Sequence, residues 1–327
     1  MSKKINIGVL GCANIAKRFM LPAINELEEY FVLTGVASRA EEQANVFANK
    51  FSTTAFFDYD SLLNDENIEA AYIPLPNSLH YKWIKKSLQK GKHVLVEKSM
   101  ACTYDEVVEL NNLAQEKQLV LLENFQFRFH SQLKYIKMLV DSGKIGELRN
   151  IRSSFGFPPF IDDNNIRYKK ELGGGALLDA GAYPLKISQI FLGQDLFVDS
   201  ASLFEDTHKG VDTWGSACLK QKSGKVTSQI AFGFDHYYQN SIELWGSKGK
   251  ISTNRIFTAA PGFEPVIELE TANGKEHVKL DSDHHFKNML LHFYNQIKTK
   301  DNVENEYTQN VNQARLIEEL KDKANGK

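Results

Sequence analysis

The sequence predicts an α/β protein in which a doubly wound parallel sheet is followed by an α/β part with an open-faced, mostly antiparallel sheet. Three observations support this fold class. Apolar runs alternate with segments of helical periodicity up to residue 123, which is typical of parallel strands joined by right-handed crossovers. The first apolar run ends in a glycine turn that leads into a helix. Alternating apolar and polar residues dominate after residue 124, as in an antiparallel sheet with one covered face.

The first stretch, residues 5–18 (INIGVLGCANIAKR), has the strand–turn–helix pattern of a dinucleotide-binding βαβ unit. Such a turn places backbone N–H groups at a helix N-terminus, where a pyrophosphate can bind. Gly11 permits the tight turn, Ala13 replaces the second glycine of the G-x-G-x-x-G/A fingerprint, and Ala16 is small enough for helix–strand packing. The fingerprint is degraded, and small residues also follow buried strands for packing reasons alone.

The ends of the next strands predict where a dinucleotide would bind. We expect strands at 31–37, 53–57, 68–75, 93–97 and 119–123, and helices at 40–51, 78–91 and 104–118. A ligand on such a sheet lies beyond the carboxyl ends of the strands. The predicted cofactor residues are therefore Gly11, Cys12, Ala13, Asn14, Ile15, Ser38, Arg39, Leu75, Pro76, Asn77, His80, Glu97, Lys98 and Asn124. His80, at a helix entrance, is equally explained as a packing or capping histidine.

The end of the second strand distinguishes NAD from NADP. An acidic residue there would hold a ribose 2′-hydroxyl, whereas this chain has Ser38, which can donate a hydrogen bond, and Arg39, which can pair with a 2′-phosphate. The pattern favours NADP. A solvated arginine at the start of a helix is the alternative interpretation of Arg39.

The second part of the chain begins with a helix at 131–146 and continues in long alternating segments. The Asn273-Gly274 pair between two of these segments predicts a hairpin with a two-residue loop. We expect a dinucleotide-binding domain at 1–123 and a substrate-binding and oligomerisation domain at 124–327. Because one face of the second sheet carries large apolar residues at alternate positions, we expect a homo-oligomer, a dimer or tetramer, to cover it.

Composition excludes several classes of function. A net charge of −2 over 327 residues argues against nucleic acid or a membrane surface as the main partner. The sequence has neither a membrane-spanning apolar run nor a secretion signal, so we expect a cytoplasmic protein. The three cysteines, far apart in sequence, suggest neither disulfides nor a metal site. Residues 283–285 (DHH) open an amphipathic helix, where capping explains them better than metal binding.

The segment Glu171–Gly193 (ELGGGALLDAGAYPLKISQIFLG) stands out in the second part. Its three consecutive glycines let the chain pass close to another group. Asp179 and Tyr183 follow four residues apart, and so on one face of a helix. A capping aspartate and an interfacial tyrosine would explain this pair without any function.

Five stretches together resemble the glucose–fructose oxidoreductase/inositol dehydrogenase (Gfo/Idh/MocA) family over essentially the full chain. They are IGVLGCANIAKRFMLPAI, YIPLPNSLHYKWIKKSLQKGKHVLVEKS, SGKIGELRNIRSSF, ELGGGALLDAGAYPL and IELWGSKGKI. The resemblance implies a Rossmann domain, an open-faced α/β domain, a nicotinamide cofactor and a sugar or polyol substrate. The opening GCANIAKR-x-x-LPAI and the tyrosine of the D-x-G-x-Y pattern look most like sugar-nucleotide ketoreductases, which reduce the C-3 keto group of a dTDP-linked dideoxysugar in deoxysugar biosynthesis.

The resemblance therefore implies an NADP-dependent oxidoreductase acting on the CH–OH/C=O couple. Two alternatives remain. A free-sugar or trans-dihydrodiol dehydrogenase of the same family shares the tyrosine pattern. A regulator that binds a dinucleotide without turnover shares the fold, but retention of Lys98 and Tyr183 argues against it.

Hydride delivery to a carbonyl carbon builds negative charge on its oxygen, so a proton donor and a positive group must lie near that oxygen. Tyr183 is the predicted donor, and Lys98, after a strand of the first domain, is the predicted cation. By family resemblance Asp179 orients or neutralises Lys98. The family's E-K-P signature appears as Glu97-Lys98-Ser99, with the proline lost. The predicted substrate residues are Gln126, Arg128, Arg167, Tyr168 and Tyr183, with the arginines able to pair with a diphosphate.

Overall fold

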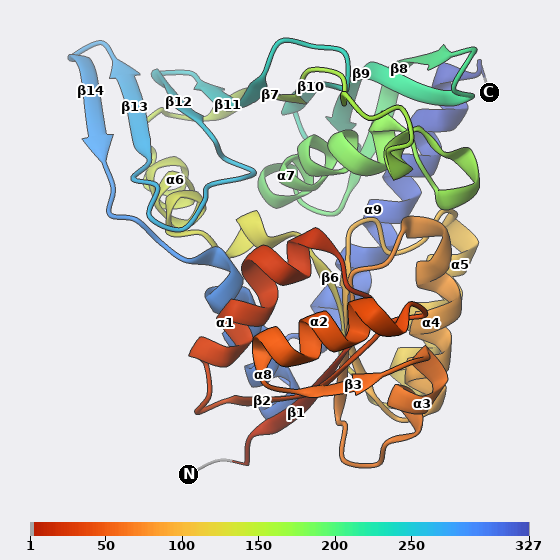
Figure 1. Ribbon diagram of the computed structural model, residues 1–327. Helices are drawn as coiled ribbons and strands as arrows, with labels where there is room; N and C mark the ends of the chain where they lie inside the picture. Colours follow the sequence, from red (N-terminus) through yellow and green to blue (C-terminus); the bar gives the residue numbers. More distant parts are fainter. Residues whose placement is uncertain (1–2, 327) are drawn as a thin grey trace. The chain divides into compact units, whose positions relative to one another are not determined.

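The computed structural model describes residues 3–326, which form two compact units (Figure 1). The first unit runs to Asn124 and also includes Phe286–Val311, and the second comprises Phe125–His285 and the chain from Asn312. A single division after residue 123 differs from this arrangement because residues 286–311 return to the first unit. Buried polar contacts hold them there: the amide of Asn310 donates to Asn111 and to the Leu121 carbonyl, each at 3.1 Å.

The first unit contains the predicted doubly wound parallel sheet. Its strands are β1 (Ile5–Leu10), β2 (Phe31–Ala37), β3 (Thr54–Phe56), β4 (Ala70–Ile73), β5 (His93–Glu97) and β6 (Leu121–Asn124). The spatial order β3-β2-β1-β4-β5-β6 reverses direction between β1 and β4, and this switch point is where such folds bind dinucleotides. The central strands are apolar runs buried on both faces, as in the four-residue β4, which is buried throughout, whereas the edge strand β3 has no buried residue.

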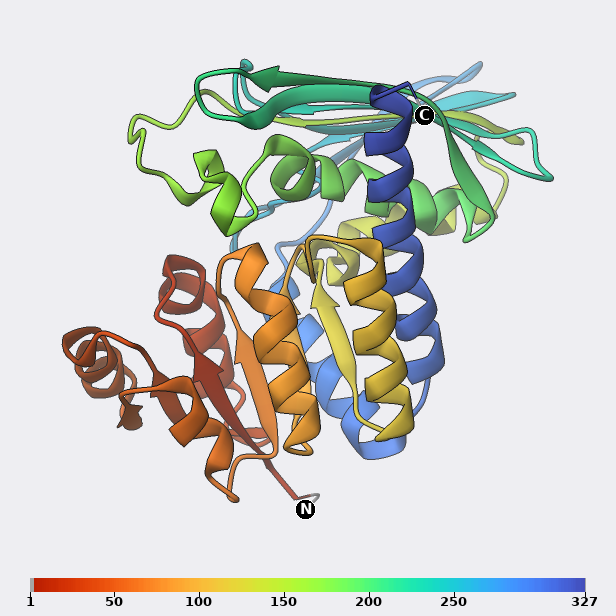
Figure 2. The same ribbon diagram turned by 90° about the vertical axis from the view of Figure 1, so that its right-hand side faces the viewer.

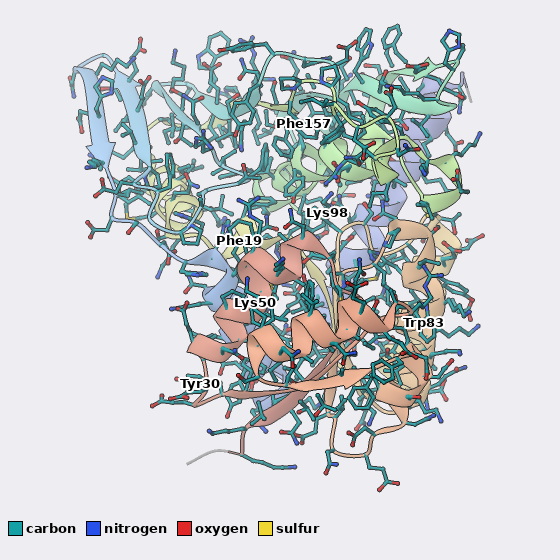
Figure 3. The ribbon with its side chains drawn as sticks, viewed as in Figure 1. Phe19, Tyr30, Lys50, Trp83, Lys98 and Phe157 are labelled. Carbon is teal, nitrogen blue, oxygen red and sulfur yellow. The ribbon has the colours of Figure 1, made fainter. Side chains whose placement is uncertain are left out.

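Helices lie on both sides of this sheet (Figures 1 and 2). They are η1 (Ala16–Met20), α1 (Leu21–Glu26), α2 (Glu41–Phe51), α3 (Tyr59–Asn64), α4 (Asn77–Gln89), α5 (Tyr104–Glu116), α8 (His285–Thr299) and the first part of α9 (Val303–Ala324). Local sequence fixes several starts: Asp58 caps α3, and Thr103 with Glu106 forms a capping box at α5. In α4, Trp83 packs edge-on against Tyr59 with ring centroids 4.8 Å apart (Figure 3).

The second unit is organised by a mostly antiparallel sheet. Its strands are β7 (Leu148–Gly156), β8 (Leu196–Asp206), β9 (Val211–Gln221), β10 (Thr227–Gly233), β11 (Gln239–Gly246), β12 (Gly249–Asn254), β13 (Val266–Thr271) and β14 (Gly274–Lys279). They lie in the order β14-β13-β12-β11-β7-β10-β9-β8, with the pair β7–β10 parallel and the others antiparallel. This arrangement confirms the predicted fold class.

One face of this sheet is covered and the other is bare, as Figure 2 shows for α7 (Ala182–Leu192) beneath the strands. Alternation explains the difference: in β11 Ile242 and Leu244 are buried, whereas Trp245 is 52% exposed. The other helical segments of this unit are η2 (Gln126–Phe129), α6 (Ser131–Asp141), η3 (Ile166–Tyr168), η4 (Lys170–Leu172) and η5 (Leu177–Gly181). No helix among residues 3–326 has a stretch long and apolar enough to cross a membrane.

The predicted hairpin is present between β13 and β14, with its loop displaced by one residue. Thr271 pairs with Gly274, so the two loop residues are Ala272 and Asn273. Gly274 has φ +120° and begins the second strand. Its glycine is needed just after the loop, because that backbone conformation disfavours any residue with a Cβ.

Candidate functional site

The turn after β1 has the geometry of a dinucleotide-binding loop. Gly11 adopts φ +115°, and its N–H donates to the Ala37 carbonyl at 2.9 Å. A Cβ at this position would lie 2.8 Å from Leu75 Cδ2, so only glycine fits. Helix begins at Asn14 and passes at once into the π-helical segment η1. Irregular turns of this kind occur often at functional sites.

The end of β2 carries the groups expected to discriminate NADP from NAD. Arg39 is exposed, and Ser38 is buried, with its hydroxyl accepting a hydrogen bond from the Ala40 N–H at 3.1 Å. Burial raises the pKa of the neighbouring Tyr59 phenol, and the Arg39 guanidinium opposes this. Burial also raises the pKa of Cys12 to about 11, against a hydrogen bond with Ser38. Cys12 is therefore a neutral thiol at pH 7.

His80 supports the loops of this edge and has no ring nitrogen left for a cofactor. It is fully buried, with Nε2 2.7 Å from the Leu75 carbonyl oxygen and Nδ1 2.8 Å from the Ser99 carbonyl oxygen. Burial lowers its pKa to about 4, although the two carbonyls favour the protonated ring. Direct cofactor contact, as predicted from the strand ends, does not agree with this geometry, whereas the packing interpretation does.

Glu97 and Asn124 form a buried polar pair at the ends of β5 and β6. Glu97 Oε1 accepts from the Tyr72 hydroxyl at 2.6 Å and from Asn124 Nδ2 at 2.8 Å. Burial raises the pKa of Glu97, while these two hydrogen bonds oppose the shift. Asn124 Oδ1 is buried and has no hydrogen-bond partner among residues 3–326. A buried acceptor of this kind at a strand end suits the amide N–H of a nicotinamide carboxamide, so the site fits the predicted cofactor.

Lys98 comes directly after β5, at the carboxyl edge of the first sheet (Figure 3). This edge also holds Gly11 after β1 and Asn77, the first residue of α4 after β4. Parallel strands therefore bring the glycine turn and an ammonium group to one side of one sheet. These residues are far apart in the sequence, and the order of the strands brings them to the same edge of the sheet.

Tyr183, in the second unit, is held in a cage of four phenylalanine rings. The ring centroids of Phe125, Phe127, Phe155 and Phe257 lie 5.6, 5.9, 5.1 and 5.6 Å from that of Tyr183. Only 7% of Tyr183 is exposed. Edge-to-face contacts fix the orientation of a ring, so the Tyr183 ring, which carries the hydroxyl, is held in one orientation.

Sequence reasoning missed this cage. The alternating phenylalanines in residues 125–129 (FQFRF) were a signal that two rings face one side. Phe155 and Phe257 arrive from distant segments, and no local pattern marks them.

Asp179 pairs with Arg167 inside the second unit, with Arg167 Nε 2.7 Å from Asp179 Oδ2. The carboxylate raises the pKa of the guanidinium, and Tyr183 acts in the same direction. Asp179 lies in the π-helical segment η5 and Tyr183 in α7, and Arg167 interacts with both.

The three glycines before η5 let the chain pass two obstacles. A Cβ on Gly174 would lie 2.5 Å from the Arg167 carbonyl oxygen, and one on Gly175 would lie 2.3 Å from Asp212 Oδ1. Asp212 accepts from the Leu177 N–H at 2.6 Å, at the start of η5. The glycines thus allow the loop and the Asp212 carboxylate to pack against η5, the segment that carries Asp179.

The remaining predicted substrate residues lie in two loops of the second unit. Gln126 and Arg128 are in η2, where Gln126 is buried and the Arg128 guanidinium lies 5.2 Å from the Phe129 ring centroid. Tyr168 is buried, and its hydroxyl accepts from the Phe160 N–H at 3.0 Å. Tyr168 therefore uses its polar group inside the loop. Arg167 lies over the Phe160 ring at 5.0 Å.

Comparison with known proteins agrees with this geometry. Residues 5–125 match the Gfo/Idh/MocA oxidoreductase family, described as an NAD-binding Rossmann fold, and residues 133–252 match the C-terminal domain of that family. The chain belongs to the Gfo/Idh/MocA family. The predicted family is thereby confirmed.

Several Gfo/Idh/MocA proteins are similar over nearly the whole chain. The dTDP-3,4-didehydro-2,6-dideoxy-alpha-D-glucose 3-reductase of Saccharopolyspora spinosa is 40% identical, covering 93% of this chain and 91% of its own. A 3-ketoreductase from Actinomadura kijaniata, solved with NADP and TDP-benzene, is 35% identical with a TM-score of 0.93, covering 98% of this chain and 97% of its own. D-xylose 1-dehydrogenase (NADP(+)) 2 of Haloferax volcanii is 32% identical, covering 78% and 77%.

The crowding at Gly175 predicts a specific loss of stability. Gly175→Ala should destabilise the protein by roughly 2–4 kcal/mol, because it combines a φ of +112° with displacement of Asp212. Gly210→Ala is the matched control: its φ is +65° but no atom lies within 4 Å of a Cβ there, so it should cost only about 1 kcal/mol. Chemical denaturation of both variants measures the difference, and equal losses would refute the steric account.

Proposed function

We propose that this protein is an NADPH-dependent reductase of the C-3 keto group of a dTDP-linked keto-deoxysugar. The observation that carries the proposal is similarity over almost the whole chain to reductases of that substrate. Two local features support it. The groups after β2 suit a 2′-phosphate, and both Lys98 and Tyr183 are present.

The first unit holds the cofactor in this proposal. The turn at Gly11 receives the pyrophosphate, and Ser38 and Arg39 receive the 2′-phosphate. Asn124 Oδ1, otherwise without a partner among the described residues, accepts from the carboxamide. The bound cofactor supplies the hydride, and the protein supplies orientation and charge.

Lys98 and Tyr183 complete the reaction at the substrate oxygen. Tyr183 gives its hydroxyl proton to that oxygen as negative charge develops there. The Lys98 ammonium hydrogen-bonds to the same oxygen and stabilises both the oxyanion and the phenolate that remains. Asp179 acts through Arg167: their ion pair holds a second cation near the phenolate. The phenylalanine cage limits the directions in which the hydroxyl can move.

Arg167 is the residue best suited to an anionic part of the substrate. Its Nε is used by Asp179, and among residues 3–326 neither terminal guanidinium nitrogen has a hydrogen-bond partner. Two parallel N–H groups can bind a phosphate bidentately. With Gln126 and Arg128 of η2, it forms the proposed set for a nucleoside diphosphate.

A second candidate is the oxidation of a free sugar with NADP. Similarity to an NADP-dependent xylose dehydrogenase supports it, and the same lysine and tyrosine chemistry run in reverse would suffice. This alternative needs no diphosphate site. Binding of a nucleoside diphosphate therefore separates the two candidates.

The direct test is reduction of dTDP-3,4-didehydro-2,6-dideoxyglucose, followed by loss of NADPH absorbance, with D-xylose and NADP as the competing reaction. We expect turnover of the nucleotide sugar and calorimetric binding of dTDP to the NADPH complex. NADPH binding without any response to dTDP, together with xylose oxidation, would replace this proposal by the second candidate.

Removing either reacting group should abolish catalysis while the cofactor still binds. Lys98→Ala and Tyr183→Phe should each lower kcat by about 10²–10⁴-fold, with the NADPH dissociation constant changed less than about threefold. Stopped assays and fluorescence titration of NADPH measure the two quantities. Wild-type turnover in either variant would refute the corresponding role.

Cofactor preference should depend on Arg39. Arg39→Ala removes the guanidinium proposed for the 2′-phosphate, so NADPH binding should weaken about 10- to 100-fold, the worth of one or two charged hydrogen bonds. NADH binding should change less than about threefold. The matched control is Lys50→Ala, at the far end of α2, which should leave both affinities unchanged. Equal weakening of NADPH and NADH would remove the basis for the NADP assignment.

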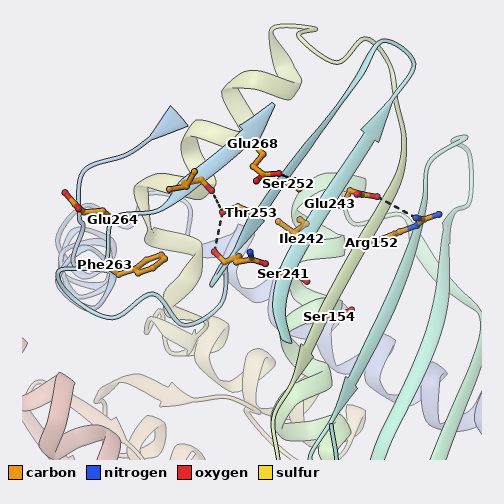
Figure 4. Close-up of a pocket in the computed structure, with 12 residues that line it drawn as sticks. Arg152, Ser154, Ser241, Ile242, Glu243, Ser252, Thr253, Phe263, Glu264 and Glu268 are labelled. Carbon is orange, nitrogen blue, oxygen red and sulfur yellow. Dashed lines mark hydrogen bonds and ion pairs between the residues drawn. The ribbon is translucent and has the colours of Figure 1, made fainter. Parts of the chain in front are cut away.

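We propose in addition that two copies meet through the bare face of the second sheet. Trp245 and Phe204 are 52% and 45% exposed there. Charged side chains of both signs surround a hollow on this face, shown in Figure 4, where Arg152 lies 3.7 Å from Glu243. A surface that carries both signs can complement itself across a two-fold axis.

Sedimentation equilibrium tests this assembly. The wild-type protein should sediment as a dimer or tetramer, and Trp245→Glu should shift it toward monomer because a charge would be buried opposite its own copy. The control Val32→Glu places the same charge on an exposed residue of the first unit. A wild-type monomer at micromolar concentration would contradict the proposal.

A further inference from the structure

The residues on both sides of Lys98 are held by hydrogen bonds from three other segments of the first unit, β4, α4 and β6. Before Lys98, the Glu97 side chain accepts from Tyr72 and Asn124. After it, the Ser99 carbonyl oxygen lies 2.8 Å from His80 Nδ1. His80 is 0% exposed and Ser99 is 2% exposed, so water does not compete for the contact between them.

The next residue is fixed in the same way. The Met100 N–H donates to Glu123 Oε1 at 2.8 Å, and both residues are 2% exposed. The peptide group between Ser99 and Met100 is therefore anchored on both sides, through the Ser99 carbonyl and through the Met100 N–H. The ammonium of a flexible lysine side chain is confined to a defined region only if the Cα of the lysine is fixed.

His80 links this anchor to a second loop. Its Nε2 lies 2.7 Å from the Leu75 carbonyl oxygen, and the Leu75 side chain is the group that would meet a Cβ on Gly11. One imidazole thus contacts both the segment after β4, which adjoins the turn at Gly11, and the segment after β5, which carries Lys98, and in its neutral form it donates its single N–H to one of the two carbonyls. We propose that His80 is a positioning residue that sets the location of the Lys98 ammonium relative to the cofactor loop. This inference rests on the role proposed for Lys98.

A double-mutant cycle tests the link between the two residues. His80→Phe keeps a ring of similar size but removes both polar contacts. It should lower kcat about 10- to 100-fold, as expected for a catalytic group displaced by about 1 Å, with KM changed less than about threefold. In the Lys98→Ala background the same substitution should cost less than about threefold, because its effect acts through Lys98. An equal fall in both backgrounds would overturn the proposal.

Two further variants separate positioning from folding. His80→Asn can still donate to the Ser99 carbonyl, so its kcat should be at least about tenfold higher than that of His80→Phe. His93→Phe is the matched control, because His93 accepts from the Val120 N–H at 2.9 Å at the opposite end of β5. It should reduce thermal stability without lowering kcat more than about twofold. A loss of kcat like that of His80→Phe would indicate a general structural effect.

A readout without substrate keeps this inference distinct from the proposed function. Lysines of the cofactor-free protein can be reductively methylated with ¹³C-formaldehyde, and the Lys98 resonance assigned by its absence in Lys98→Arg. This resonance should shift and broaden in His80→Phe and stay unchanged in His93→Phe. An unshifted resonance in His80→Phe would refute positioning, whereas failure of the wild type to reduce any keto-sugar would refute the proposed function alone.

Discussion

The hydrogen bonding of buried polar groups at the carboxyl edge of the first sheet is the constraint on which the cofactor half of the site depends. Parallel strands deliver their last residues to one edge, and side chains there leave water when helices cover the sheet. Each buried polar atom then needs a partner. Tyr72, Glu97 and Asn124 satisfy one another in this way, and the atom left over, Asn124 Oδ1, lies where a ligand is expected.

The second unit achieves rigidity by different means. Its central group, Tyr183, is fixed by aromatic packing, and the Arg167–Asp179 ion pair lies in the same unit. Edge-to-face contacts between the rings fix the orientation of the tyrosine ring.

The sequence predicted the elements of the first unit closely, because buried parallel strands are continuous apolar runs and the helices between them have helical periodicity, with side-chain caps at α3 and α5. The edge residues followed from the strand ends, and so Gly11, Ser38, Arg39 and Lys98 could be identified without a structure. The position of His80 in the sequence left two interpretations, a cofactor residue and a packing or capping residue. Only the distances to two backbone carbonyls, from residues 5 and 19 positions away, assign its ring.

Other features could not be predicted because they depend on distant segments. The return of residues 286–311 rests on contacts such as that between Asn310 and Asn111, and amphipathic periodicity does not say which core a helix covers. The phenylalanine cage likewise assembles from three segments that are distant in the sequence. Patterns along a chain encode local secondary structure and the apolar face of each helix or strand. A site built from several elements is defined by how these elements pack together.

The family's proline is replaced here by Ser99, and the hydrogen bonds around this position bear on what the replacement changes. A proline restricts the backbone through its own ring, and a serine provides no such restraint. Here the carbonyl of Ser99 and the N–H of Met100 are each bound to a buried side chain, and these bonds restrict the segment from outside. A proline at 99 would leave both bonds possible, since its carbonyl remains and Met100 keeps its N–H. The hydrogen bonds are therefore compatible with either residue, and the fixed position of Lys98 need not depend on which one the chain carries.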